Sequence, residues 1–237
     1  MSGWKLRLGV AVPSANAVME PEFNRMAPAG VSVHFARMWL KADTKEQISA
    51  LIDHTEKAAE LLTHAGVELI AFGCTSGSLI KGMGYDTKII NLIEQTTGLA
   101  ATTTSTAIIA ALKALDINNL TVVAPYPDWL MEKVKSFLTN NGFSVVSMKG
   151  LGLVEGPEIR DTPVEAVYEL TKKTVVKDTD GVFISCTGFP SIEVLDSIEQ
   201  DLGIPTISSN QATFWQMLRQ GGLKTKIPGY GTLLRDY

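Results

Sequence analysis

The two cysteines are the residues of this chain best suited to chemistry, because each follows an apolar run and precedes small hydroxyl residues. Cys74 lies in the sequence FGCTSGS and Cys186 in ISCTGFP. A thiol at the carboxyl end of a buried strand, beside the free N–H groups where the next helix begins, is expected to favour the thiolate and to bind anions. A single buried cysteine is often only a small apolar side chain. Two cysteines in matching surroundings favour catalysis.

The spacing of these motifs indicates an internal duplication. Cys186 follows Cys74 by 112 residues, and Pro125 follows Pro13 by the same interval, each proline ending an apolar run. A third match, IEQTTG with IEQDLG, lies 105 residues apart, as a short deletion in the second copy would produce. We therefore expect two half-sites, each with one thiol, that face each other.

Other polar residues are expected at the same cleft, where strands end. Asn16 and Ser14 follow the first apolar run, and Tyr126 occupies the equivalent loop of the second copy. An amide or a phenol there can hydrogen-bond a carboxylate, although both are also common in turns and caps. Asn210 follows a later strand and could either line the cleft or cap the next helix.

The residues beside the cysteines are expected to act mainly through their backbone N–H groups. These residues are Thr75, Ser76, Thr187 and Gly188. Such groups can hold a carboxylate or stabilise a developing enolate. The alternative role for them is plain helix capping.

The composition argues against several classes of partner and cofactor. The 237 residues are 45% apolar and 19% charged, with a net charge of -4 and no cluster of Lys and Arg, so we expect no nucleic-acid surface. The sequence begins without the apolar region of a signal peptide and has no stretch long enough to cross a bilayer, so we expect a cytoplasmic protein without membrane contact. Two cysteines without CxxC spacing and three histidines without HExxH predict neither a disulfide nor a metal site. The absence of GxGxxG after a strand predicts no dinucleotide.

Apolar runs bounded by turn residues predict strands that alternate with helices. The expected strands are 8–12, 31–36, 69–72, 120–124, 144–148 and 181–185, with short ones before Thr102 and Ser208. Helical periodicity is clearest over 44–65 and 163–177. Continuous apolar strands separated by helices are typical of parallel sheets that are covered on both faces.

These elements predict an α/β fold made of two similar lobes, each a doubly wound parallel sheet, related by pseudo-twofold symmetry. The expected first lobe is 1–103, completed by 214–237, and the second is 104–213. Because sites of such folds lie at the carboxyl ends of the strands, we expect the active site in the cleft between the lobes.

Several stretches resemble the aspartate/glutamate racemase superfamily, in particular its branch of maleate cis-trans isomerases and arylmalonate decarboxylases. They are VPSANAVMEPE, GCTS, APY, SCTG and SNQAT with the tryptophan that follows, and the resemblance runs nearly end to end. It implies a cofactor-independent enzyme with a thiol on each side of a small carboxylate substrate. It also implies a homodimer or a higher homo-oligomer.

Departures from the family's patterns narrow the reaction that the resemblance implies. Amino-acid racemases have an acidic residue after the first strand and a His after the second Cys-Thr, where this chain has Ser14 and Gly188 followed by Phe189. Arylmalonate decarboxylases keep only the second thiol, so Cys74 favours the maleate isomerases. The isomerases carry a further substrate-binding Asn in a region where this chain has Asp161, which would repel a dicarboxylate if it reached the site.

The resemblance therefore implies isomerisation of maleate to fumarate. The Cys74 thiolate would add to C2, giving a succinyl-like adduct whose former double bond can rotate, while Cys186 moves a proton at the neighbouring carbon. Asn16, Tyr126 and the two Cys-Thr turns would hold the carboxylates. Two alternatives stay open: a racemase or decarboxylase of another small carboxylate that uses thiol proton transfer, and a carboxylate-binding protein without catalysis.

Overall fold

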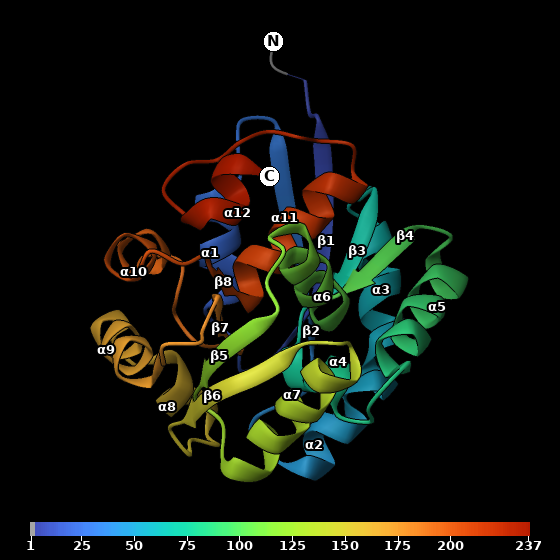
Figure 1. Cartoon of the computed structure of the whole chain (residues 1–237). Coiled ribbons are helices and arrows are strands. Elements are labelled where there is room, and N and C mark those ends of the chain that lie inside the picture. The colour runs from blue at the N-terminus through green and yellow to red at the C-terminus, as the bar shows by residue number, and fades with distance from the viewer. Residues whose placement is uncertain (1–2) are drawn as a thin grey trace.

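Two four-stranded parallel sheets form the framework of the computed structural model, which describes residues 3–237 (Figure 1). The first sheet has the order β2-β1-β3-β4 and consists of β1 (Leu6–Pro13), β2 (Val31–Met38), β3 (Leu69–Phe72) and β4 (Ala100–Thr103). The second has the order β6-β5-β7-β8 and consists of β5 (Asn119–Ala124), β6 (Ser144–Gly150), β7 (Gly181–Ile184) and β8 (Thr206–Ser208). The two halves of the chain thus share one topology, and the predicted α/β fold with parallel sheets is confirmed.

Helices connect the strands and flank both sheets. In the first half they are α1 (Met19–Met26), α2 (Lys45–Ala50), the 3-10 helix η1 (Leu51–His54), α3 (Thr55–Thr63), α4 (Thr75–Leu79), α5 (Tyr85–Thr97) and α6 (Thr104–Ala114). In the second half they are α7 (Asp128–Asn140), α8 (Gly156–Arg160), α9 (Val164–Thr174), α10 (Leu195–Leu202), α11 (Ser209–Gln220) and α12 (Gly231–Asp236). None of these helices is long and apolar enough to cross a membrane, as far as residues 3–237 are concerned.

The predicted strands are confirmed, and one predicted helix is corrected. The helical pattern over 44–65 corresponds to α2, η1 and α3 in succession, because a 3-10 turn at 51–54 divides it. Thr44 caps the first of these by accepting a hydrogen bond from the Gln47 N–H at 3.3 Å. The pattern over 163–177 forms the shorter helix α9.

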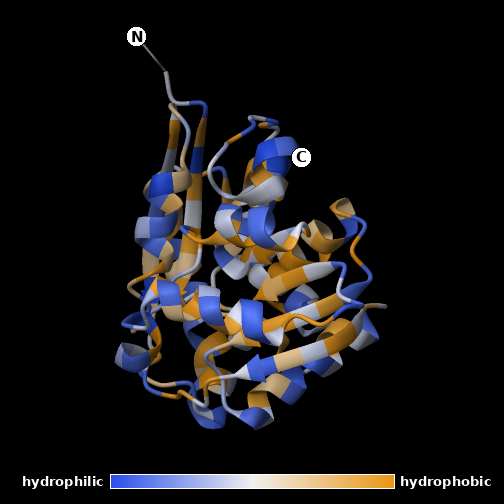
Figure 2. Cartoon of the chain, turned by 60° about the vertical axis from the view of Figure 1, so that its left-hand side comes forward, coloured by the Kyte–Doolittle hydropathy of each residue, from blue (hydrophilic) through white to orange (hydrophobic). Residues whose placement is uncertain are grey.

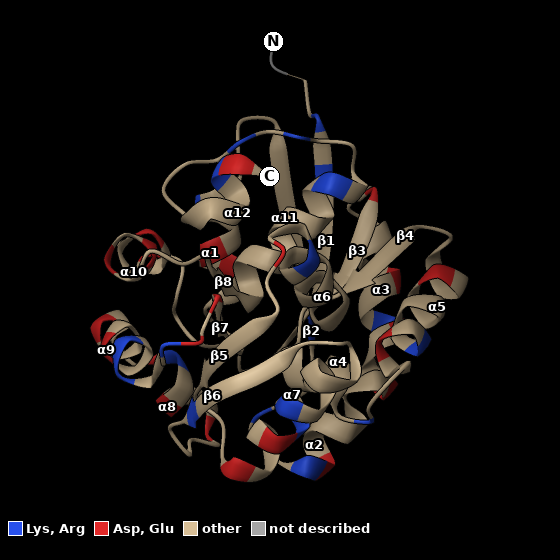
Figure 3. Cartoon of the chain, viewed as in Figure 1, with Lys and Arg blue, Asp and Glu red and all other residues tan. Residues whose placement is uncertain are grey.

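The apolar core lies around the strands, and the charged residues lie outside it. All residues of β3 and β7 are buried, as continuous apolar strands between two helical layers require. Figure 2 shows hydrophobic colouring on the strands and hydrophilic colouring on the outer turns of the helices. Lys, Arg, Asp and Glu lie mostly on helices and loops, and the strands are mostly free of them (Figure 3).

Helices α6 and α11 pack against each other between the two sheets (Figure 1). They are equivalent in the two halves, since α6 follows β4 and α11 follows β8. The hydroxyl of Thr213 on α11 donates to that of Thr104 on α6 at 3.2 Å, and both residues are buried. This helix pair therefore joins the halves immediately behind the strand ends.

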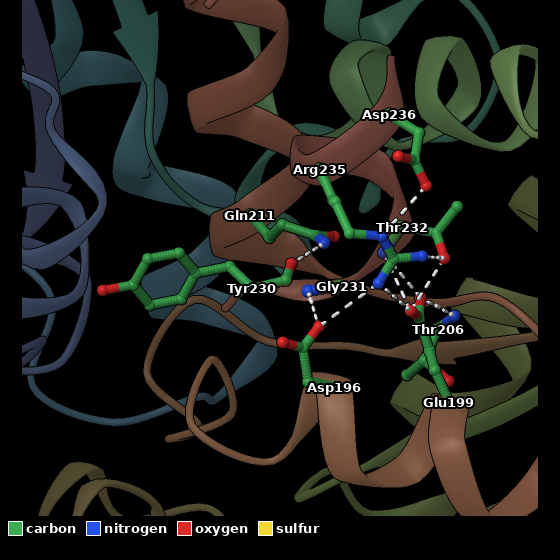
Figure 4. Close-up of polar contacts among 9 residues, drawn as sticks. All are labelled: Asp196, Glu199, Thr206, Gln211, Tyr230, Gly231, Thr232, Arg235 and Asp236. Carbon is green, nitrogen blue, oxygen red and sulfur yellow. Dashed lines mark hydrogen bonds and ion pairs between the residues drawn. The ribbon is translucent and has the colours of Figure 1, made fainter. Parts of the chain in front are cut away.

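The last helix, α12, is anchored to α10 and β8 by one buried carboxylate (Figure 4). The Glu199 side chain accepts hydrogen bonds from the N–H groups of Thr206 and Thr232 and from the Thr232 hydroxyl, and it lies 3.7 Å from the Arg235 guanidinium. Helix α11, by contrast, contacts α1, β3 and β4 of the first half. The C-terminal segment thus contacts both halves of the chain.

The loops after β2 and β6 meet above the strand ends. Ala42 and Glu155 form an antiparallel bridge, and the Asp43 N–H donates to the Val154 carbonyl at 2.9 Å. Because β2 and β6 hold equivalent places in the two sheets, each half supplies one loop to this cover.

Candidate active site

One cavity lies at the carboxyl ends of the strands of both sheets. It has an empty volume of about 440 Å³, counting the part of its mouth that is open to solvent. Its lining includes eight of the ten residues selected from the sequence, namely Asn16, Cys74, Thr75, Ser76, Tyr126, Cys186, Thr187 and Gly188. The two cysteine turns, from opposite halves of the chain, therefore share one cavity.

Cys74 stands directly before α4, in the geometry expected from the sequence. It is the N-cap residue of that helix, with extended backbone dihedrals, and its sulfur accepts a hydrogen bond from the Gly77 N–H at 3.3 Å. The Ser76 hydroxyl lies 3.5 Å from the same sulfur. Glycine at 77 allows this close approach, because a Cβ there would lie 3.0 Å from the Cys74 sulfur and 2.9 Å from Leu51, so that these neighbours would have to shift.

The turn at Cys186 differs from the expectation. No helix begins after it, since the next helix along the chain is α10 at Leu195. Cys186 has φ of 113°, a backbone conformation that costs a non-glycine residue about 1–3 kcal/mol. Its sulfur accepts from the Gly188 N–H at 3.3 Å. The two thiols thus have similar hydrogen bonds but different backbones.

Hydrogen bonds link the two cysteine turns to each other. The Ser209 hydroxyl, at the start of α11, accepts from the Thr75 hydroxyl at 2.9 Å and from the Cys186 N–H at 3.0 Å. In the other direction, the Thr187 hydroxyl donates to the Gly73 carbonyl at 3.3 Å. These contacts hold the two thiols in a fixed relation.

Asn16 connects the first loop to the second cysteine turn. Its side-chain oxygen accepts from the N–H groups of Val18 and Met19, and its amide nitrogen donates to the Thr187 hydroxyl at 3.0 Å. This arrangement fixes the amide with its nitrogen toward the cavity and leaves one N–H hydrogen free to bind a ligand.

Two residues predicted to bind substrate lie outside the lining. The Ser14 hydroxyl is paired with the backbone of Leu40, 3.1 Å from both its N–H and its carbonyl. Asn210 is fully buried and donates to Glu22 at 2.6 Å and to the Thr187 carbonyl at 3.0 Å. Both side chains position loops in this structure and do not line the cavity.

Asp161, a possible obstacle to a dicarboxylate, is also outside the cavity. Its side chain is 66% exposed and lies 3.1 Å from the guanidinium of Arg160, which does line the cavity. The negative charge of Asp161 is therefore in solvent and compensated by a neighbour.

The expectation that the site favours thiolates is wrong. Burial raises the pKa of Cys74 to about 12, and the nearby Asp43 adds to this rise, against the hydrogen bonds from Ser76 and Gly77. Burial, and then Asp43, also raises the pKa of Cys186, against hydrogen bonds from Tyr126 and Gly188. The N–H groups beside each sulfur do not offset the loss of solvation, so both thiols are protonated at neutral pH.

Sequence reasoning missed Asp43, the acidic residue of the cavity. It lies in the loop after β2, is only 9% exposed, and lines the cavity together with the thiols. Burial raises the pKa of its carboxyl to about 7. Nothing in the local sequence KADT marks this role, because it arises from the meeting of two distant loops.

The fold and the site define a class of α/β protein in which two matching halves each place a thiol on one cavity. The family model described as arylmalonate decarboxylase matches residues 8–234, and the chain belongs to this enzyme family.

Both reactions considered from the sequence occur among its relatives. The chain is 28% identical to a maleate isomerase of Nocardia farcinica and 28% identical to an arylmalonate decarboxylase of Bordetella bronchiseptica, in each case over 97% of this chain and 96% of the relative. A crystal structure of a cysteine-to-alanine variant of the maleate isomerase Iso from Pseudomonas putida S16 with maleate superposes with a TM-score of 0.91 at 26% identity. That superposition covers 97% of both chains.

Proposed function

We propose that this protein isomerises maleate to fumarate through a covalent adduct on Cys74. The observation that carries the proposal is the placement of two buried thiols from opposite halves of the chain on one small cavity. The maleate isomerases among the relatives support the choice of substrate.

The proposed cycle begins when Cys74 gives its proton to solvent at the open mouth of the cavity and its sulfur bonds to C2 of maleate. The π electrons move to C3 and its carboxylate, and the Cys186 thiol gives its proton to C3, which leaves a succinyl thioether and a Cys186 thiolate. The single bond between C2 and C3 then rotates. The Cys186 thiolate removes a proton from C3, the bond between sulfur and C2 breaks, and fumarate leaves. The Cys74 thiolate then takes a proton back from solvent.

The surrounding side chains suit these steps. The Gly77 N–H and the Ser76 hydroxyl lie beside the Cys74 sulfur and stabilise the thiolate as it forms and as it leaves. The free hydrogen of the Asn16 amide is available for a carboxylate of the substrate. The Tyr126 phenol lines the same cavity as Cys186 and acts to lower the pKa of that thiol, so it supports the charge that develops on the second sulfur.

The test follows the olefinic proton signals of maleate by NMR in D2O under reducing conditions. Wild-type protein is expected to convert maleate to fumarate, and Cys74→Ala to lose this activity by at least about three orders of magnitude, as removal of a covalent nucleophile does. An active Cys74→Ala variant would contradict the mechanism.

The same spectra discriminate the second candidate, a decarboxylase or racemase of another small carboxylate. Its support is the related arylmalonate decarboxylase and the apolar part of the lining, Leu40, Ala42 and Ile159. That reaction predicts unchanged maleate and, with an aryl- or alkylmalonate, release of carbon dioxide with solvent deuterium at the α-carbon.

A further inference from the structure

We propose that Asp43 holds one carboxylate of the substrate by donating a hydrogen bond as the neutral acid, so that a dicarboxylate binds together with one proton from solvent. This inference rests on the proposed function, since it takes a dicarboxylate as the ligand. It assigns a substrate-binding role to a residue outside the two cysteine turns.

Asp43 has a fixed position in the cavity and lacks a polar partner there. Its side chain lines the cavity, is more than nine-tenths buried, and has no hydrogen-bond or ion-pair partner in the part of the chain that the structure describes. Its backbone is fixed, because its N–H donates to Val154 and its neighbour Ala42 is bridged to Glu155. A buried carboxyl held in place without a partner is costly, and a ligand in the cavity can supply the missing partner.

The groups around Asp43 do not stabilise a negative charge on its carboxyl. The groups that face it are the Cys74 thiol after β3, the Cys186 thiol after β7 and the Tyr126 phenol after β5, and each of these is neutral or anionic. The two cations of the lining, Lys41 and Arg160, belong to exposed residues. Within residues 3–237, the lining of this cavity therefore holds no buried positive charge to offset the two carboxylates of maleate and an ionised Asp43.

Protonation of Asp43 removes this repulsion between carboxylates. Desolvation and charge repulsion would both weaken the binding of a dianion beside an ionised Asp43. A protonated Asp43 instead offers an O–H donor to a carboxylate oxygen. Burial already raises the pKa of Asp43 to about 7, and a dianion nearby raises it further. Maleate affinity is thus expected to fall about tenfold for each pH unit above pH 7, where the ligand itself is fully ionised.

The experiment is calorimetric titration of the full-length Cys74→Ala variant with maleate, since this variant is expected to bind maleate without turning it over. Titrations at pH 8 in two buffers of different ionisation heat give the number of protons taken up, which is expected to be close to one. The double variant Cys74→Ala with Asp43→Asn, which replaces the neutral acid by a neutral donor of the same shape, is expected to bind maleate without proton uptake. It should also make the affinity independent of pH between 7 and 8.5.

The matched control is Asp161→Asn, the same change at an exposed acid beside the cavity, which is expected to keep the proton uptake. Maleate binding by Cys74→Ala without proton uptake and with the same affinity at all these pH values would overturn the inference, and this arm needs no variant of Asp43. The inference would also be overturned if the half-amide of maleate bound more tightly than maleate, because an ionised Asp43 would then accept a hydrogen bond from the amide.

Turnover by the wild-type protein separates this inference from the proposed function. Proton-linked maleate binding without fumarate formation would leave the role of Asp43 intact and overturn isomerisation. Fumarate formation without proton uptake on binding would overturn the role of Asp43 and leave isomerisation intact. A complete lack of maleate binding would overturn both.

Discussion

Cys74 and Cys186 present their thiols to one cavity from two different backbone geometries, and this difference suits a division of labour. Cys74 is an N-cap residue in an extended conformation, with the Gly77 N–H aimed at its sulfur. Cys186 has φ of 113°. Strain of this kind is retained where surrounding contacts fix it, and here the bond from the Cys186 N–H to Ser209 is one such contact.

Turnover of bound maleate is expected to rise with pH. Because burial raises the pKa of Cys74 to about 12, the thiolate is a small fraction of this residue near neutrality, and that fraction grows about tenfold per pH unit. The measurement is kcat at saturating maleate between pH 6.5 and 8.5. A kcat that stays constant over this range would mean that the nucleophile is already ionised when the substrate is bound.

At the scale of elements, a buried carboxylate on α1 fixes the turn that carries Cys186. Glu22 is 6% exposed, and one of its oxygens accepts from the N–H groups of Ser191 and Ile192. The other accepts from the Asn210 amide, whose nitrogen also donates to the carbonyl of Thr187, the residue after Cys186. A helix of the first half thus positions the turn of the second half that carries Cys186.

Glu22→Gln is expected to loosen this turn. The new amide would direct N–H groups at the Asn210 amide nitrogen, so one buried hydrogen bond is lost and the variant loses about 1–3 kcal/mol of stability. We expect a lower melting temperature and a lower kcat for maleate, both measured beside Glu20→Gln. Glu20 lies on the same helix and pairs with Arg37 at the surface, so its variant should resemble wild type. Wild-type kcat in Glu22→Gln would contradict the positioning role.

The elements and the thiols could be predicted from sequence because their signals are local. Apolar runs place the strands, and the repeated Cys-Thr turns place both thiols at strand ends. The 3-10 turn at 51–54 and the φ of Cys186 have no such signal, because tertiary packing decides them. Asp43 enters the site only because the loops after β2 and β6 meet, which no local pattern encodes.

At the scale of the whole molecule, the site exists only where the two halves of the chain meet. Each half supplies one thiol, and the contacts of Ser209 with Thr75 and Cys186 join them across the boundary. The equal topology of the two sheets agrees with the duplication expected from the sequence and accounts for the matching positions of the thiols at strand ends. The division of the chain into lobes at residue 103, the cytoplasmic location and the homodimer remain predictions.

The central claim, a covalent bond between Cys74 and the substrate, is tested most directly by intact-protein mass spectrometry of Cys186→Ser incubated with maleate. This variant keeps the nucleophile and has a hydroxyl in place of the Cys186 thiol. Solvent can supply the proton to C3 in a slow first step, but a hydroxyl is too weak a base to remove it again, so the adduct should accumulate. The account predicts an increase by the mass of one maleic acid per chain, located by peptide mapping at Cys74, and no increase in Cys74→Ser. An adduct on any other residue, or unchanged mass in a folded Cys186→Ser that has lost turnover, would contradict it.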